Sequence, residues 1–180
     1  MQNKKPLKKP GPKKKQKKPL KQHSSQPLPK LKKAVQDLAN KYARLRDCAG
    51  SDGAACISCG KWFSYDELDG GHYIPTTVSS TRFDERNINA QCRRCNRFLH
   101  ANLRGYFRGL EKKLGRSGLD DLESIAGPKK WTREELTELK EYYNGKIKAL
   151  QAGKTPGTES DPRLEVLEMF EDMGTTGEMP

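Results

Sequence analysis

The chain has 180 residues and a formal net charge of +12, with 35 Lys and Arg against 23 Asp and Glu. No run of about 18 apolar residues occurs and no apolar stretch follows the basic N-terminus, which argues against a membrane-spanning helix and a signal peptide. We therefore expect a cytoplasmic protein with a nucleic-acid partner, because a basic chain is suited to binding phosphates.

The N-terminal segment is the most basic part of the chain. Residues 1–33 contain 13 lysines and no acid, with six prolines among them. Such a composition buries little apolar surface, so we expect residues 1–30 to be a disordered basic arm. The arm fits two roles, a solubilising tail or a sequence-independent contact with DNA phosphates.

Folded structure is expected to begin near Leu31 and to form one domain over residues 31–152. Apolar residues recur there at three- and four-residue steps, which predicts an amphipathic helix that ends near Gly50. Its core-facing stripe comprises Leu31, Val35, Leu38, Tyr42 and Leu45.

Two CysxxCys pairs follow this helix, Cys56 with Cys59 and Cys92 with Cys95. Each pair directs two thiolates at one ion, so together they supply the four soft ligands that Zn²⁺ prefers. An odd total of five cysteines argues against a disulfide framework. Cys48 is then a spare thiol. Because only 33% of the residues are hydrophobic, we expect a structural zinc ion to help stabilise the fold.

Between the cysteine pairs, residues 62–65 and 71–75 are predicted to form a hairpin that turns around Asp69, Gly70 and Gly71. After Cys95 a helix is expected from about Arg97 to Leu114, with a possible break near Asn102 and a stop at Gly115. A short helix should follow over residues 118–125.

The last predicted helix begins with a capping box, Thr132 followed by Glu135, ahead of an apolar stripe that ends at Leu150. Residues 153–180 form an acidic tail that we expect to be disordered. Alternatively, Val166, Met169, Phe170 and Met173 could form a short apolar helical stripe that docks on a partner protein or folds back on the basic arm.

Several of these segments resemble a known family. His72 in GlyHisTyrIlePro (71–75), Asn87 in AsnIleAsnAlaGlnCys (87–92) and Asn96 directly after CysArgArgCys resemble the signature of HNH endonucleases. Longer segments resemble the NinG (Rap) family of lambdoid phage recombination proteins over roughly residues 31–150. These segments are AspGlyGlyHisTyr (69–73), ArgPheAspGluArgAsnIle (82–88), GlnCysArgArgCysAsn (91–96) and TrpThrArgGluGlu (131–135).

The resemblance implies an α+β protein with a zinc-stabilised ββα-metal (HNH-like) core flanked by helices. It further implies a phage-encoded, structure-specific DNA endonuclease acting on branched recombination intermediates such as Holliday junctions and D-loops. The products would carry 5′-phosphate and 3′-hydroxyl ends. A homodimer would match the two-fold symmetry of a four-way junction.

His72 is the expected general base, because a largely neutral imidazole can take a proton from water at pH 7. The alternative is an ordinary structural histidine. By resemblance, Asn87 would bridge the loop backbone and orient His72. Its alternative is an ordinary turn asparagine.

The catalytic metal is expected to be Mg²⁺ or Mn²⁺, held by hard oxygen ligands. The family usually places an acid or histidine directly before the catalytic histidine, whereas this chain has Gly71. Asp69 is the nearest carboxylate, Asn96 takes the final position of the signature, and His100 is either a further ligand, a phosphate contact or without a role. Five arginines are candidate DNA contacts, or else a solvated face: Arg93, Arg94, Arg97, Arg104 and Arg108.

One further class of function fits the same residues. A zinc-dependent DNA-binding recombination accessory protein would need the cysteines and the basic surface without any catalysis. His72 would then be dispensable.

Overall fold

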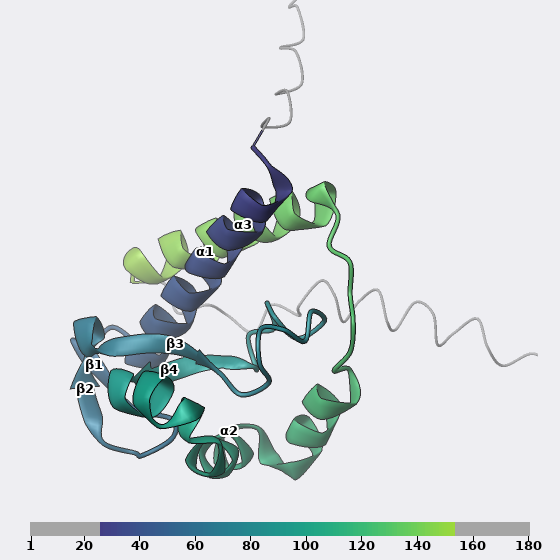
Figure 1. Cartoon of the computed structure of the whole chain (residues 1–180). Coiled ribbons are helices and arrows are strands. Elements are labelled where there is room, and N and C mark those ends of the chain that lie inside the picture. The colour runs from purple at the N-terminus through teal and green to yellow at the C-terminus, as the bar shows by residue number, and fades with distance from the viewer. Residues whose placement is uncertain (1–25, 154–180) are drawn as a thin grey trace, which may run out of the picture.

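The computed structural model describes residues 26–153, which form three long helices and two small antiparallel sheets (Figure 1). This mixture confirms the predicted α+β class. The predicted basic arm and acidic tail lie almost entirely outside the described residues. In chain order the main elements are α1 (Leu28–Cys48), β1 (Gly53–Ala55), β2 (Trp62–Ser64), β3 (Leu68–His72), β4 (Ile88–Cys92), α2 (Leu103–Ser124) and α3 (Arg133–Gln151).

Helix α1 confirms the first predicted helix and begins three residues earlier than expected. Its apolar stripe packs against α3, and the Tyr42 and Tyr143 rings lie 5.7 Å apart. The two helices run side by side above the β3–β4 sheet (Figure 1). This core gathers twelve buried side chains: Leu31, Val35, Ala39, Tyr42, Ala43, Phe83, Ile88, Trp131, Leu136, Leu139, Tyr143 and Ile147.

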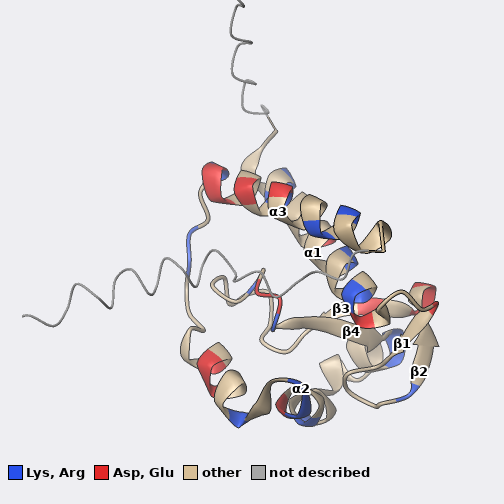
Figure 2. Cartoon of the chain, turned by 180° about the vertical axis from the view of Figure 1, so that it is seen from behind, with Lys and Arg blue, Asp and Glu red and all other residues tan. Residues whose placement is uncertain are grey.

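Helix α3 begins with the predicted capping box. The Glu135 amide donates to Thr132 Oγ1 at 3.2 Å, and the Thr132 amide donates to Glu135 Oε2 at 2.8 Å. Acidic residues lie toward the start of the helix and basic residues toward its end (Figure 2). This order complements the helix dipole, so α3 has favourable charges at both ends.

The predicted hairpin between residues 62–65 and 71–75 is wrong. Strand β2 pairs with β1, and β3 pairs with β4 in a register that places His72 opposite Ile88. Gly70 and Gly71 lie within β3 and make no turn. A Cβ atom on Gly70 would lie 2.7 Å from Asn40 Cα, and one on Gly71 would lie 2.1 Å from Gln91 Oε1. Glycine is needed at both positions because Asn40 and Gln91 lie too close to the strand for a side chain to fit.

Helix α2 follows two short helical turns, Arg94–Phe98 and His100–Asn102. The break near Asn102 and the interruption at Gly115, where φ is +73°, are both as predicted. The helix packs against the loop after β3, where Tyr106 and Leu110 join an apolar cluster with Ile74, Leu119 and Leu122. This second apolar cluster is separate from the core between α1 and α3.

Within residues 26–153 there is no helix of the length and apolar character needed to cross a membrane.

Candidate active site

The four predicted zinc cysteines converge in the structure. The sulfur atoms of Cys56, Cys59, Cys92 and Cys95 all lie within 4.8 Å of one another, and three of the four residues are buried. The β1–β2 hairpin presents the first pair, while the end of β4 and the turn after it present the second. Among the described residues, this is the one group of three or more Cys, His, Asp or Glu ligand atoms close enough to share an ion.

The cluster fits a zinc ion by its donor chemistry. Burial raises the pKa of the Cys92 thiol to about 12; a backbone hydrogen bond from Cys95 opposes this rise, whereas the Cys95 side chain and the charge of Cys56 add to it. A shared divalent cation would allow all four thiols to ionise. The Cys92 amide already donates to Cys56 Sγ at 3.3 Å, which supports a thiolate at that position. Cys48 is buried in a different cluster with Leu68.

Asn87 fixes the long loop between β3 and β4. Its Oδ1 accepts from the Ile74 amide at 2.7 Å, and its Nδ2 donates to the carbonyls of Ile74 and Thr81, both at 3.0 Å. The Tyr73 amide donates to the Asn87 carbonyl at 3.1 Å, which continues the ladder past His72. The asparagine thus bridges the two ends of the loop and contacts the backbone two residues after His72.

The His72 side chain is half-buried and faces α1. Its Nε2 atom lies 3.1 Å from the Arg82 carbonyl oxygen and 3.2 Å from Gln36 Nε2. These two contacts require different tautomers, because a carbonyl accepts a proton whereas an amide nitrogen donates one. In either tautomer the neutral imidazole keeps one unprotonated nitrogen.

Burial is the main cause that lowers the pKa of His72 to about 4; the positive charge of Arg82 acts in the same direction, and hydrogen bonds to the Arg82 and Gly70 backbone oppose it. The Arg82 guanidinium is itself fixed, because its Nε donates to Gln36 Oε1 at 2.9 Å. His72 is therefore neutral at pH 7 and is available as a proton acceptor.

Asp69 and Asn96, the expected oxygen ligands of the catalytic metal, are hydrogen-bonded to each other. Asn96 Nδ2 donates to Asp69 Oδ2 at 3.0 Å, and Arg97 forms two hydrogen bonds to the same carboxylate at 2.8 and 2.7 Å. Burial would raise the pKa of Asp69, but these donors and the charges of Arg97 and Arg93 outweigh it and lower the pKa. The carboxylate is thus ionised. The pair borders a polar groove of about 390 Å³ that is lined by Asp37, Asn40, Arg44, Asp69, Gly70, Asn96 and Arg97.

This donor set fits a hydrated divalent cation only if Arg97 releases Asp69, since the guanidinium stands against both carboxylate oxygens. Arg97 has the freedom to do so, because its side chain is 58% exposed. His100 lies in the left-handed turn before α2 and is exposed. All five candidate DNA-contacting arginines are exposed as well: Arg93, Arg94, Arg97, Arg104 and Arg108.

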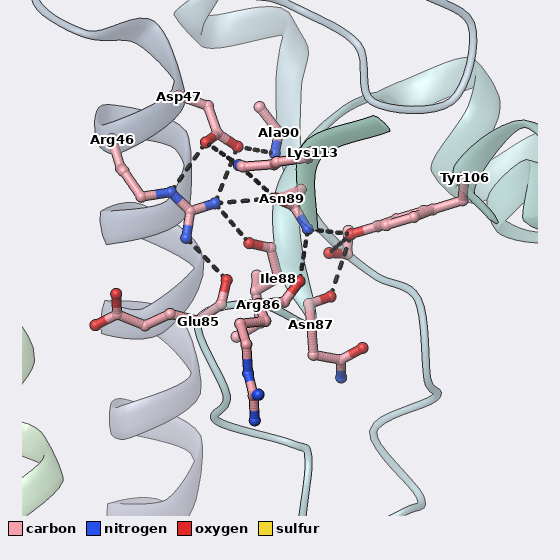
Figure 3. Close-up of polar contacts among 11 residues, drawn as sticks. Arg46, Asp47, Glu85, Arg86, Asn87, Ile88, Asn89, Ala90, Tyr106 and Lys113 are labelled. Atoms are coloured by element: carbon pink, nitrogen blue, oxygen red, sulfur yellow. Dashed lines mark hydrogen bonds and ion pairs between the residues drawn. The ribbon is translucent and has the colours of Figure 1, made fainter. Parts of the chain in front are cut away.

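A polar network around Arg46, Asp47 and Lys113 supports the β3–β4 hairpin (Figure 3). Arg46 donates to the carbonyls of Glu85 and Ile88, both at 2.8 Å, and pairs with Asp47 at 2.9 Å. Asp47 in turn accepts from Lys113 at 2.8 Å. The network joins the end of α1 to β4, to the loop before it and to α2.

Tyr106 connects this network with the candidate active site (Figure 3). Its hydroxyl lies 2.8 Å from the Gly71 carbonyl and 3.2 Å from the Asn87 carbonyl, and it accepts from Asn89 Nδ2 at 3.2 Å. The tyrosine therefore fixes the backbone directly before His72.

No motif in the sequence marks Arg82 or Tyr106 as a site residue. Gln36 has a weak signal, because it is a polar residue directly after Val35 of the core-facing stripe, and the structure buries it. Arg82 and Tyr106 reach the site through tertiary packing, which no local pattern encodes.

Comparisons with known proteins point to one family. The family model described as "Bacteriophage Lambda NinG protein" matches residues 1–153. Proteins named "Protein ninG" from Escherichia phage lambda, Salmonella phage P22 and Escherichia phage 933W are each 36% identical over 124 residues, or 68% of this chain. The match spans 58% or 59% of the length of these relatives. No solved structure matches the chain.

Proposed function

Because the chain belongs to the NinG family of bacteriophage proteins, we propose that it is an HNH-type, structure-specific DNA endonuclease. It would hydrolyse phosphodiesters in branched recombination intermediates such as Holliday junctions and D-loops. One observation carries the proposal. A neutral, backbone-anchored histidine, His72, follows Asp69 by three residues on β3, and the Asp69 carboxylate is paired with Asn96 in a polar groove whose lining does not include His72.

The order of elements supports the nuclease assignment. Strands β3 and β4 are followed by the helical turn Arg94–Phe98, so His72, Asn87 and Asn96 come from a strand, the loop before the next strand, and a helical turn. A ββα-metal nuclease has its catalytic residues in these positions. The four cysteines close the same unit and would hold Zn²⁺ as a structural ion.

In the proposed reaction His72 takes a proton from the attacking water. The Arg82 carbonyl and Gln36 limit rotation of the imidazole, and Asn87 keeps the following loop in place. A bound DNA phosphate would add negative charge beside His72 and raise its pKa from about 4 toward neutrality. The histidine would then become a stronger base only when substrate is present.

Asp69 and Asn96 would hold Mg²⁺ or Mn²⁺ once Arg97 turns toward the DNA. The ion would neutralise charge on the phosphate and on the leaving oxygen. Arg97 would then contact a phosphate together with Arg93, Arg94, Arg104 and Arg108, because guanidinium groups match phosphate oxygens in geometry.

The second candidate function is a non-catalytic, zinc-dependent DNA-binding accessory protein. The paired state of Asp69 favours this alternative, because a carboxylate held by Arg97 at 2.7 and 2.8 Å is satisfied without a metal ion. Such a protein would bind DNA through the same arginines and would leave it intact.

A substrate panel separates the two functions. The zinc-loaded, full-length protein is incubated with linear, forked and four-way DNA of matched sequence, with and without Mg²⁺ or Mn²⁺. The endonuclease proposal expects metal-dependent nicks in the branched substrates and few in the linear duplex. Tight binding without cleavage, with either ion and on every substrate, would favour the accessory protein.

A further inference from the structure

Three large apolar side chains beside the candidate active site are exposed to solvent. Phe98 is 76% exposed, Leu99 46% and Leu103 49%. Burying such side chains ordinarily stabilises a fold, and contiguous exposed apolar groups mark interaction sites. Phe98 is the most exposed large apolar residue in the described chain.

The backbone around Phe98 is held firmly although it is unfavourable. His100, Ala101 and Asn102 have φ values of +45°, +65° and +41°, a conformation that non-glycine residues rarely adopt. Gln91 Nε2 at 2.5 Å and Ser58 Oγ at 3.4 Å both donate to the Ala101 carbonyl, and Asn102 Nδ2 donates to Cys95 Sγ at 3.5 Å. Strained backbone that is fixed in this way is concentrated at functional sites.

The other side of the turn is equally fixed. Cys95 belongs to the metal-binding cluster, and Arg97, the residue before Phe98, forms two hydrogen bonds to Asp69. Asp69 lies three residues before His72 on β3. The Phe98 ring is thus presented from a rigid turn at the edge of the candidate active site.

The positive charge of the residues around Phe98 indicates which kind of ligand its ring would bind. Residues 93–108 contain five arginines and no acid. An exposed aromatic ring among guanidinium groups fits a polyanion that also offers flat apolar faces, which describes a nucleic acid with unpaired bases. In a continuous duplex the base faces are stacked on one another and are not accessible to the ring.

We propose that Phe98 stacks on a nucleobase that is unstacked at the branch point of DNA, beside the polar groove that Asp69, Asn96 and Arg97 line. Leu99 and Leu103 would extend the apolar contact, and Arg104 would contact a flanking phosphate. The inference rests on the proposed function for its DNA substrate but not for cleavage. It assigns the recognition of a branch to a residue outside the proposed catalytic group.

The test measures binding, with no Mg²⁺ or Mn²⁺ added. A four-way junction carries 2-aminopurine at the branch point, and a linear duplex of the same sequence carries it within a continuous helix. Wild-type protein should bind the junction more tightly and change the 2-aminopurine fluorescence only in the junction. Phe98→Ala should lose about tenfold in junction affinity, as expected for one base–aromatic stack, and should lose the fluorescence change.

Two variants serve as controls. Phe98→Trp keeps a stacking ring and should retain both signals. Trp62→Ala removes another exposed aromatic, 60% exposed in the β1–β2 hairpin, and should bind both DNAs as the wild type does. Equal thermal melting of all variants would show that the exposed positions leave the fold intact.

The proposal is overturned if Phe98→Ala keeps the junction preference and the fluorescence change, or if it weakens duplex and junction binding equally. These outcomes are independent of catalysis. A wild-type protein that stacks on the base but never cuts would overturn the endonuclease proposal alone. Cleavage by Phe98→Ala with wild-type rate and preference would overturn the stacking proposal alone.

Discussion

His72 illustrates how surroundings set the chemistry of a single residue. An exposed histidine titrates near pH 6.5, whereas burial and the charge of Arg82 lower the pKa of His72 to about 4. The same surroundings place a carbonyl at 3.1 Å and an amide at 3.2 Å from Nε2, so one of them can hydrogen-bond to the ring in either tautomer. The imidazole is therefore neutral in the resting protein, and a bound phosphate would have to raise its pKa toward the operating pH for efficient general-base catalysis.

This pKa shift predicts a specific pH dependence of stability. The unfolded chain binds a proton at position 72 below about pH 6.5, whereas the folded protein resists protonation until about pH 4. The contribution of His72 is therefore complete above pH 6.5 and is lost as the pH falls toward 4, with a slope of at most about 1.4 kcal/mol per pH unit. Urea unfolding between pH 7.5 and 5 measures it.

His72→Gln is the matched variant for that experiment. It retains hydrogen-bonding capacity and has no titrating group, so its free energy of unfolding should vary less with pH than that of the wild type. Acid effects on the cysteines are common to both proteins and cancel in the difference. Identical pH dependence in the two proteins would contradict the assigned environment of His72.

The cysteine cluster allows a second residue-scale prediction. Cys92→Ser removes one of four converging ligands, so the protein should lose zinc and a large part of its stability, because metal binding contributes directly to folding. Cys48→Ser is the control, since Cys48 is buried away from the cluster. Native mass spectrometry and thermal melting measure both effects. Equal zinc content in the two variants would refute a four-cysteine site.

At the scale of elements, local signals predicted the helices well. The Thr132–Glu135 capping box and the break at Gly115 depend only on residues that are close in the sequence. Both could therefore be predicted from the sequence alone. The strand pairing depends on distant residues and was predicted wrongly. Gly70 and Gly71 are typical of a turn, yet they are needed because Asn40 of α1 and Gln91 of β4 approach the strand closely.

Arg46, Asp47 and Lys113 form the polar network that joins three elements, and the sequence contains no local sign of it. Their partners come from residues up to 66 positions apart. Asp47 also accepts from the Ala90 amide of β4 at 2.7 Å, and its side chain is 14% exposed. Burial opposes ionisation, but the charges and hydrogen bonds of Arg46 and Lys113 lower the pKa of Asp47.

Removal of this carboxylate should therefore be strongly destabilising. Asp47→Ala leaves Arg46 buried without its anion, for which we expect a loss of roughly 3–5 kcal/mol in the free energy of unfolding. Asp37→Ala, also on α1, breaks the exposed pair with Lys33 and should cost about 0.5 kcal/mol or less. Urea denaturation measures both. A similar loss in the two variants would contradict the buried character of the network.

At the scale of the whole molecule, the candidate site draws residues from α1, β3, the loop after it and the turn before α2. The family resemblance made His72, Asn87 and Asn96 candidates, and the spacing of the cysteines predicted their convergence. Gln36 and its neighbours on α1 could not be identified in this way, since only folding brings that helix against β3.

The basic arm should add DNA affinity without adding selectivity. Deleting residues 1–25 removes ten lysines and spares Gln26, whose carbonyl accepts from Arg133 at 2.7 Å. Lysine–phosphate contacts release counterions, so the deletion should flatten the dependence of log affinity on log salt. Preference for branched over linear DNA should remain. An unchanged salt slope would exclude the arm as a DNA contact.

The central claim is that His72 is the base of a metal-dependent nuclease, and the rate of four-way DNA cleavage tests it most directly. Wild-type, His72→Ala and His72→Gln proteins are compared with Mg²⁺ or Mn²⁺, after zinc content and DNA binding have been matched. We predict that both variants bind DNA and zinc normally and cut at least about 100-fold more slowly than the wild type. Full activity in either variant, or no cleavage by the wild type with either ion, would contradict the claim.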